Sequence, residues 1–193
     1  MTAFDRDTKK LNLGCGEFKK AGYLNLDYGS VTPPDIAHNL ESIPYPFEND
    51  HFNLVEADHV LEHLGSPFSV MREIHRITEN GGKVVIRTPH FSRGFTHPEH
   101  KRGFDLTFPL YFDPQFPGGY QGVTFELDHA RIRWFAQLEL KRKVLSPLVF
   151  NTLRTIGVIV DYVANLAPMV CSRVWCYWVG GFEEVEFHFF VRK

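Results

Sequence analysis

The chain has 193 residues, the size of one domain, and residues 1–193 are expected to fold as a single unit with a substantial core. Hydrophobic residues make up 44% and charged residues 23%, a balance typical of globular rather than disordered proteins. The formal net charge is -2, so no overall positive field draws the protein to nucleic acid, and no nucleic-acid partner is expected.

The cysteines and the first residues indicate the compartment. Three cysteines, at 15, 171 and 176, are too few and odd in number for a disulfide framework, and they favour a reducing environment. Residues 1–10 are polar and charged, without the apolar segment of a secretion signal. A cytoplasmic location is therefore expected.

Two short strands are predicted first. One spans 11–13 and runs into a Gly-x-Gly turn at 14–16; the other spans 23–27, where apolar residues alternate and an acid ends the strand. Residues 31–50 are rich in Pro, Asp and Asn, which indicates a loop with one brief strand at 36–37.

A regular alternation of strands and helices follows. A strand is predicted over 51–57, a short helix over 60–64, a longer helix over 67–78 and a buried strand over 83–88. Apolar residues recur at helical spacing in the longer helix, and Asn80 with the two glycines after it supplies a stop signal. Strands that alternate with helices argue for a parallel sheet, whose ligands bind beyond the carboxyl ends of the strands.

The second half of the chain is less regular. Residues 91–123 predict a long loop dense in Phe, Pro, Gly and His, and loops of this length are usually functional. Strands are predicted over 137–145 and 184–191, paired antiparallel at the edge of the sheet. The strongly apolar segment 147–179 is predicted to be helical, and its charged residues exclude a transmembrane span. It either packs onto the domain or lies on a membrane surface as an amphipathic helix, and both alternatives stay open.

The Gly-x-Gly turn and the acid after it indicate a nucleoside site. Gly14 and Gly16 lack a Cβ, so their backbone can approach a ligand closely. A dinucleotide fingerprint needs a third glycine and an acid about 20 residues further on. Here position 19 is a lysine, and the acid comes much earlier, at Asp27. A carboxylate at that place holds a ribose diol, in NAD and in S-adenosylmethionine (SAM) alike.

The wider pattern resembles the class I SAM-dependent methyltransferases, most closely a short bacterial subgroup in which the first helix is reduced to a turn. The resemblance covers residues 11–90 in matching order and spacing. Beyond the turn and Asp27, its motifs stand at residues 38–40, 43–47, 50–55, 59–64, 73–76 and 80–82. Together with the predicted elements it implies a Rossmann-like α/β fold: a mostly parallel central sheet with an antiparallel C-terminal strand pair and an apolar helical insertion.

The same resemblance assigns residues to the parts of SAM. The backbone of the turn is expected beside the methionine part, an acid at the ribose hydroxyls, two residues at the adenine, and a second acid near the sulfonium and amino group. In this order they are Gly14, Cys15 and Gly16, then Asp27, then Asn39 and Leu40, and finally Asp58. Amides replace the usual family acids at 12, 39 and 53, but amides also form hydrogen bonds, so binding is expected to persist.

Histidines gather where the methyl acceptor is expected. His59, Glu62 and His63 would share one face of a helix, as metal ligands often do. In the alternative, His63 packs against the sheet and Glu62 pairs with an arginine. Metal-dependent methyltransferases of small-RNA 3′ ends and of ubiquinone biosynthesis are similar here, with a Glu-x-x-Glu-His run, and the RNA enzymes add a later histidine that matches His100. His59 stands in place of the first Glu, which favours Zn²⁺, Mn²⁺ or Fe²⁺ over Mg²⁺.

The resemblance implies methyl transfer from SAM to an oxygen of a small-molecule or glycan-like acceptor. His59 and His100 are the catalytic candidates: a divalent metal is held by His59, Glu62, His63 and His100, or His100 is a plain general base. A nicotinamide-dependent oxidoreductase is disfavoured, because the third glycine and a long first crossover are missing. A catalytically idle SAM-fold partner subunit is the alternative. Membrane contact through 147–179, at the inner membrane surface, would suit a lipid-linked acceptor, and the oligomeric state stays open.

Overall fold

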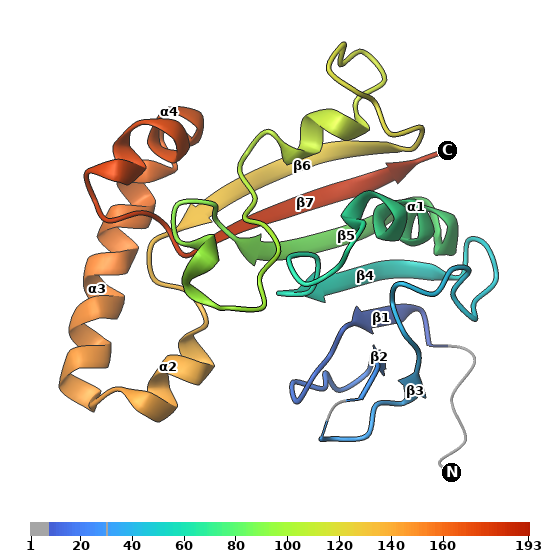
Figure 1. The fold of residues 1–193 in the computed structure, drawn as a ribbon, viewed down its shortest axis with the longest axis horizontal. Helices are drawn as coiled ribbons and strands as arrows, with labels where there is room; N and C mark the ends of the chain where they lie inside the picture. Colours follow the sequence, from blue (N-terminus) through green and yellow to red (C-terminus); the bar gives the residue numbers. More distant parts are fainter. Residues whose placement is uncertain (1–7, 30) are drawn as a thin grey trace.

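A computed structural model describes residues 8–29 and 31–193, and its centre is a seven-stranded sheet (Figure 1). The strand order is β3-β2-β1-β4-β5-β7-β6. The strands are β1 (Lys10–Leu13), β2 (Leu24–Asp27), β3 (Ile36–Ala37), β4 (Phe52–Asp58), β5 (Thr78–Pro89), β6 (Thr124–Arg133) and β7 (Glu184–Arg192). The first five run parallel, which confirms the mostly parallel Rossmann-like α/β sheet. Most of the polar start, from which the lack of a secretion signal was predicted, lies outside the described residues.

Four helices and three short 3₁₀ turns complete the described part of the fold. α1 (Pro67–Ile77) lies over one face of the sheet. The other three helices form a separate layer beside one end of the sheet (Figure 1), and they are α2 (Leu138–Val144), α3 (Pro147–Ala164) and α4 (Pro168–Arg173). The 3₁₀ turns are Gly94–Thr96, Phe108–Phe112 and Trp175–Tyr177. The predicted apolar helical insertion therefore corresponds to α3 and α4.

One face of the sheet carries the hydrophobic core. Alternate residues of the inner strands are buried on this face, among them Val55, Ile86 and Phe187. The capping side chain of Ser66 starts α1, whose buried stripe faces the sheet. The stripe is Val70, Met71, Ile74 and Ile77, and Phe104, Phe108 and Phe112 from the long 91–123 segment fill the rest of the face.

The opposite face of the sheet is charged. Glu56 and Asp58 of β4, Arg87 of β5 and Glu186 of β7 alternate with core residues along their strands. In doubly wound folds helices cover both faces, but the chain between β1 and β2 forms only turns and bends. The prediction that the first helix is reduced to a turn is confirmed. Because no crossover helix packs on this part of the sheet, charged side chains occupy the place of apolar ones.

Two predicted elements are wrong, and one strand was not predicted. Residues 61–65 form turns and bends rather than a helix over 60–64. Residues 138–144 form α2 rather than part of a strand over 137–145. The neighbour of β7 at the edge is β6 instead, and β7 runs antiparallel to both β5 and β6. Sequence alternation missed β6 because a register shift between Leu127 and His129 breaks its period.

Candidate active site

The Gly-x-Gly turn leaves β1 with backbone angles that favour glycine. Gly14 has a φ of +69° and Gly16 a φ of +49°. A Cβ on Gly14 would stand 2.4 Å from Cγ2 of Val60, so a larger residue would force Val60 to move. The N–H groups of Gly14 and Cys15 donate to the carbonyl of Leu26 at 2.8 and 3.1 Å. These bonds fix the turn over the end of β2.

Asp27 ends β2 directly beside this turn. Its Oδ2 accepts the N–H of Gly16 at 2.7 Å, and its Oδ1 accepts the N–H of Tyr28 at 2.6 Å. The carboxylate is thereby oriented, and each oxygen retains a lone pair for a further donor. Asn39 and Leu40 follow β3, the strand that pairs with β2, so they lie after the neighbouring strand end.

A cavity of about 990 Å³ opens beside the turn, at the carboxyl edge of the sheet. The turn 14–16 and Asp58, both predicted for SAM, line it, whereas Asp27, Asn39 and Leu40 lie outside its walls. Other walls come from residues that the sequence did not single out, on the charged sheet face and in the segment 133–140. They include Lys20, Arg87, Arg133, Phe135, Leu138, Leu140, Glu184 and Glu186.

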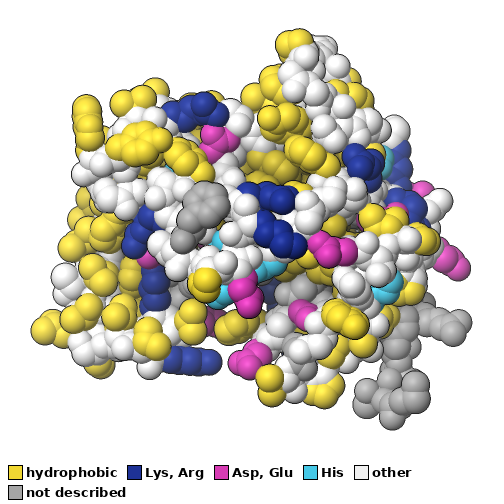
Figure 2. Space-filling view, viewed as in Figure 1, with side chains coloured by type: hydrophobic (Ala, Val, Ile, Leu, Met, Phe, Trp, Pro, Cys, Tyr) yellow, Lys and Arg dark blue, Asp and Glu magenta, His cyan; other side chains and the backbone are white. Residues whose placement is uncertain are grey.

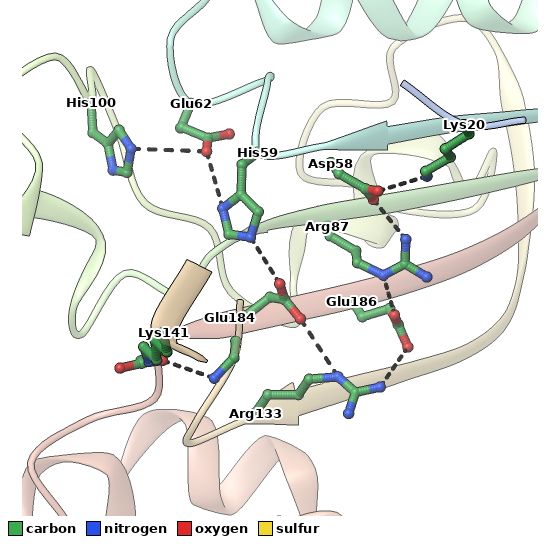
Figure 3. Close-up of polar contacts among 12 residues, drawn as sticks. Lys20, Asp58, His59, Glu62, Arg87, His100, Arg133, Lys141, Glu184 and Glu186 are labelled. Carbon is green, nitrogen blue, oxygen red and sulfur yellow. Dashed lines mark hydrogen bonds and ion pairs between the residues drawn. The ribbon is translucent and has the colours of Figure 1, made fainter. Parts of the chain in front are cut away.

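Ion pairs run without a break along the cavity wall. We call this chain the charged ladder, and it consists of Lys20, Asp58, Arg87, Glu186, Arg133 and Glu184 (Figure 3). Nζ of Lys20 lies 2.7 Å from one oxygen of Asp58, and Nη1 of Arg87 lies 2.6 Å from the other. Arg87 also pairs with Glu186, and Arg133 lies 3.4 Å from Glu186 and 3.5 Å from Glu184.

The ladder keeps Asp58 and Glu186 ionised. Burial alone would raise the pKa of Asp58, but Lys20 and Arg87 outweigh burial and lower it. Burial opposes ionisation of Glu186 as well, yet the cations around it, above all Arg87, lower its pKa to about 2. A fixed array of alternating charges therefore faces the cavity at neutral pH, which suits a polar ligand that carries charges of both signs.

His59 connects the ladder to the protein interior. Its Nε2 lies 2.8 Å from Oε2 of Glu184, and its Nδ1 lies 3.4 Å from Oε1 of Glu62. Burial would lower the pKa of His59, but the two carboxylates raise it to about 9. The imidazole is therefore protonated at neutral pH. In this state it has no lone pair for a metal ion and cannot accept a proton.

Behind His59, the side chains of Glu62, His63 and His100 converge, with one ligand atom of each within 4.8 Å of the others. Glu62 is completely buried, and neither carboxylate oxygen has a hydrogen-bond partner among the described residues. Nδ1 of His100 lies 2.6 Å from the carbonyl of Gly94, so it donates, and Nε2 is left as the acceptor, 3.9 Å from Oε1 of Glu62. Burial lowers the pKa of His63, which favours its neutral form.

The structure thus brings together three of the four residues predicted as metal ligands. They meet because the 91–123 segment folds back, with the N–H of Lys101 donating to the carbonyl of Glu62 at 2.9 Å, and not because they share a helix. Two imidazoles and a carboxylate suit Zn²⁺, Mn²⁺ or Fe²⁺. A carbonyl on the far nitrogen of His100 is the usual support of a metal-bound histidine. His59 stays outside this group.

Comparisons with known proteins agree with this fold. Residues 11–86 match the family model of the methyltransferase domain. YcgJ from Bacillus subtilis superposes with a TM-score of 0.55 at 12% identity, over 100% of this chain and 95% of that one. Phosphoethanolamine N-methyltransferase 2 from Haemonchus contortus, solved in complex with SAM, gives 0.52 at 13% identity, over 100% of this chain and 50% of that one. No curated protein matches this chain in sequence.

A third structural match shows that the fold alone does not determine the reaction. The [4+2]-cyclase SpnF superposes with a TM-score of 0.53 at 14% identity, over 99% of this chain and 78% of that one. One fold thus supports more than one chemistry, and the acceptor has to be argued from the site. The family match contains the Gly-x-Gly turn, Asp27, Asp58 and Glu62, whereas His100 and the helical layer lie beyond it.

Proposed function

We propose that this chain, which carries a SAM-dependent methyltransferase domain, transfers the methyl group of SAM to an oxygen of a small-molecule or glycan-like acceptor. The observation that carries the proposal is the cavity. Its lining includes the Gly-x-Gly turn and Asp58, and it extends along the charged ladder to the segment 133–140. Its volume is near the upper end for ligand pockets, which leaves room for an acceptor beside the cofactor.

The assignment of SAM follows the strand ends. The backbone of Gly14, Cys15 and Gly16 borders the methionine part, Asp27 accepts from the ribose hydroxyls, and Asn39 with Leu40 borders the adenine. Asp58 takes the amino group. Since both oxygens of Asp58 already pair with Lys20 and Arg87, the ammonium of SAM joins or replaces one of these cations. A displaced Lys20 is then available for the carboxylate of the same ligand.

The acceptor needs alignment and a group that takes its proton, because the sulfonium already activates the methyl group. We assign the role of general base to His100. The carbonyl of Gly94 accepts the Nδ1–H of this imidazole, so Nε2 is free to accept a proton. His59 is cationic, so we assign it a positioning role: it holds Glu62 and Glu184 in place.

A divalent ion, Zn²⁺, Mn²⁺ or Fe²⁺, fits the same cluster. Buried carboxylate oxygens without hydrogen-bond donors are costly. Neither oxygen of Glu62 accepts a hydrogen bond among the described residues, and the His59 cation, 3.4 Å from Oε1, leaves room for a second cation at Oε2. Glu62, His63 and His100 would hold the ion. When bound, such an ion lowers the pKa of an attached hydroxyl group, which is the chemistry that O-methylation requires. His100 is then a ligand rather than a plain base.

The test is turnover with labelled SAM on a panel of hydroxylated small molecules and glycans, with products identified by mass spectrometry. We expect a methyl ether on at least one acceptor. SAM binding by calorimetry without turnover on any acceptor would favour an idle partner subunit. Binding of NAD in place of SAM would overturn the proposal.

A further inference from the structure

The helical layer beside the sheet exposes most of the large hydrophobic side chains that are exposed in the described residues. Leu148 is 79% exposed, Tyr162 70% and Trp178 79%. Figure 2 shows hydrophobic side chains gathered at the left edge, where Figure 1 places α3 and α4, with Lys and Arg side chains among them. A surface this rich in exposed hydrophobic side chains marks an interaction site in a globular protein.

α3 buries a narrow apolar stripe, and its two charged residues flank that stripe. Its buried residues, Phe150, Gly157 and Ala164, are spaced seven apart and form one narrow stripe. Its charged residues, Arg154 and Asp161, lie within roughly 60° of that stripe by helical geometry. A helix on the surface of a globular protein has the reverse arrangement, with its charges outward.

The outward side of α3 carries no charge. Helical geometry places Leu148, Ile159 and Tyr162 opposite the buried stripe, and Leu166 follows just beyond the end of the helix; all four are exposed. We call these residues, with Tyr177 and Trp178 beyond α4, the apolar face.

Polar contacts fasten α3 along the end of β6, so it lies against the domain rather than apart from it. Oδ1 of Asp161 accepts the N–H of Trp134 at 2.7 Å, and the side chain of Asn165 bonds both the N–H and the carbonyl of Ile132, at 3.0 and 2.9 Å. A Cβ on Gly157 would stand 2.9 Å from Cβ of Phe135. The expectation that charged residues exclude a membrane span is wrong for α3, whose length and composition would allow it to cross one. The contacts with β6 nevertheless hold it in a position that suits lying on a membrane surface.

Charge and aromatic content indicate what covers the apolar face. Residues 138–178 contain two acidic residues, Glu139 and Asp161, and Asp161 already accepts a hydrogen bond from the N–H of Trp134. The bases are more numerous: Arg142, Lys143 and Arg154, together with Lys141 and Arg173, which pair with Glu183 and Asp105. Tyr and Trp favour the boundary between lipid and water, because their rings are apolar and carry one polar group.

We propose that the apolar face docks on the surface of an anionic lipid bilayer, with its hydrophobic side chains among the acyl chains and its basic side chains at the headgroups. A second copy of this chain fits less well, since the helical layer carries more bases than acids and a contact between two copies of it would bring these like charges together. Leu138 and Leu140 of α2 line the cavity, so the helical layer that carries the apolar face also borders the cavity. Docking does not depend on the proposed acceptor or on the metal.

The experiment is vesicle flotation of the full chain with phosphatidylcholine alone or mixed with phosphatidylglycerol. We expect flotation with the anionic vesicles, weaker flotation in high salt, and a blue shift of the emission of Trp178. Leu148→Glu and Tyr162→Glu should each reduce partitioning by roughly ten-fold or more, because they place a charge in the apolar layer. Val31→Glu, at a site that is 89% exposed on another part of the protein, should bind as the wild type does.

Two results would overturn the proposal. One is that the wild-type protein does not float with anionic vesicles, or that both glutamate variants float as well as the wild type although circular dichroism shows that they are folded. The other is a dimer in sedimentation velocity that Tyr162→Glu dissociates, which would assign the apolar face to a second copy. SAM binding is measured on the same samples by calorimetry, so a failure of docking is distinguishable from a failure of the proposed function.

Discussion

Raising the pH from about 6.5 to about 9.5 is expected to destabilise the protein through His59. Between Glu184 and Glu62 its pKa is about 9, against 6.5 for an unperturbed histidine. When folding raises the pKa of a histidine, its protonated form stabilises the folded state. This contribution to the free energy of unfolding is complete below the pKa of the unfolded state, and it is lost as the pH rises through the pKa of the folded state. This difference corresponds to about 3 kcal/mol. Because only 21% of the side chain is exposed, solvent screening removes little of it.

Three histidines have a shifted pKa of the opposite sign. Burial lowers the pKa of His63, His75 and His90, so their contribution to stability is lost as the pH falls below 6.5 rather than as it rises. The thiols of Cys171 and Cys176, whose pKa burial raises, affect stability only above pH 9.

Urea denaturation at several pH values measures the effect as the free energy of unfolding. His59→Gln should be less stable than the wild type at pH 6.5 and should show little dependence on pH up to 9. Glu184→Gln should also flatten the slope, because it removes the nearer carboxylate. His129→Gln, on the edge strand β6, is the control and should keep the wild-type slope. Equal wild-type stability at pH 6.5 and 9.5 would refute the assignment of His59 as a buried cation.

Three further predictions concern the site. Asp27→Ala should weaken SAM binding in calorimetry by roughly 2–3 kcal/mol, the cost of losing charged hydrogen bonds, and an unchanged affinity would place the ribose elsewhere. Glu62→Gln and His100→Ala should lose bound Zn²⁺, Mn²⁺ or Fe²⁺ in elemental analysis and lose turnover, with SAM affinity kept within about 1 kcal/mol. If chelators leave wild-type activity intact while His100→Ala abolishes it, His100 is a base without a metal. Gly14→Ala should lower thermal stability by roughly 1–3 kcal/mol, through its left-handed φ and the contact with Val60, and an unchanged melting temperature would contradict this.

The first half of the fold was predictable because its signals are local. A Gly-x-Gly turn directly after a short apolar strand, with an acid at the end of the next strand, specifies both a backbone conformation and a place at the sheet edge. The helical spacing of α1 is equally local, since its buried stripe can be counted along the chain.

The charged ladder was not predictable, because its partners come from strands that are distant in sequence. Arg87 meets Glu186 only after β7 pairs with β5. The sequence did contain one signal. Glu184 and Glu186 stand at alternate positions of an otherwise apolar strand, and acids buried in this way require cations on neighbouring strands. The grouping of Glu62, His63 and His100 came from the resemblance to metal-dependent enzymes. Contrary to the prediction, Glu62 and His63 do not lie on a helix. The 91–123 segment folds back instead and brings His100 to them.

The position of β7 has a consequence for how the protein is made. β7 is the last strand of the sheet in sequence, yet it lies between β5 and β6, so these two strands have no contact through the sheet until residues 184–192 arrive. During synthesis the strands β1 to β5, with the Gly-x-Gly turn and Asp58, can assemble first, because their pairings are closer in sequence. The wall that holds Glu184 and Glu186 forms only after residue 192 has left the ribosome. The end of the cavity at the Gly-x-Gly turn therefore forms before the end at Glu184 and Glu186. A ribosome that stalls before residue 184 would hold a chain whose β5 edge is open to pairing with other chains.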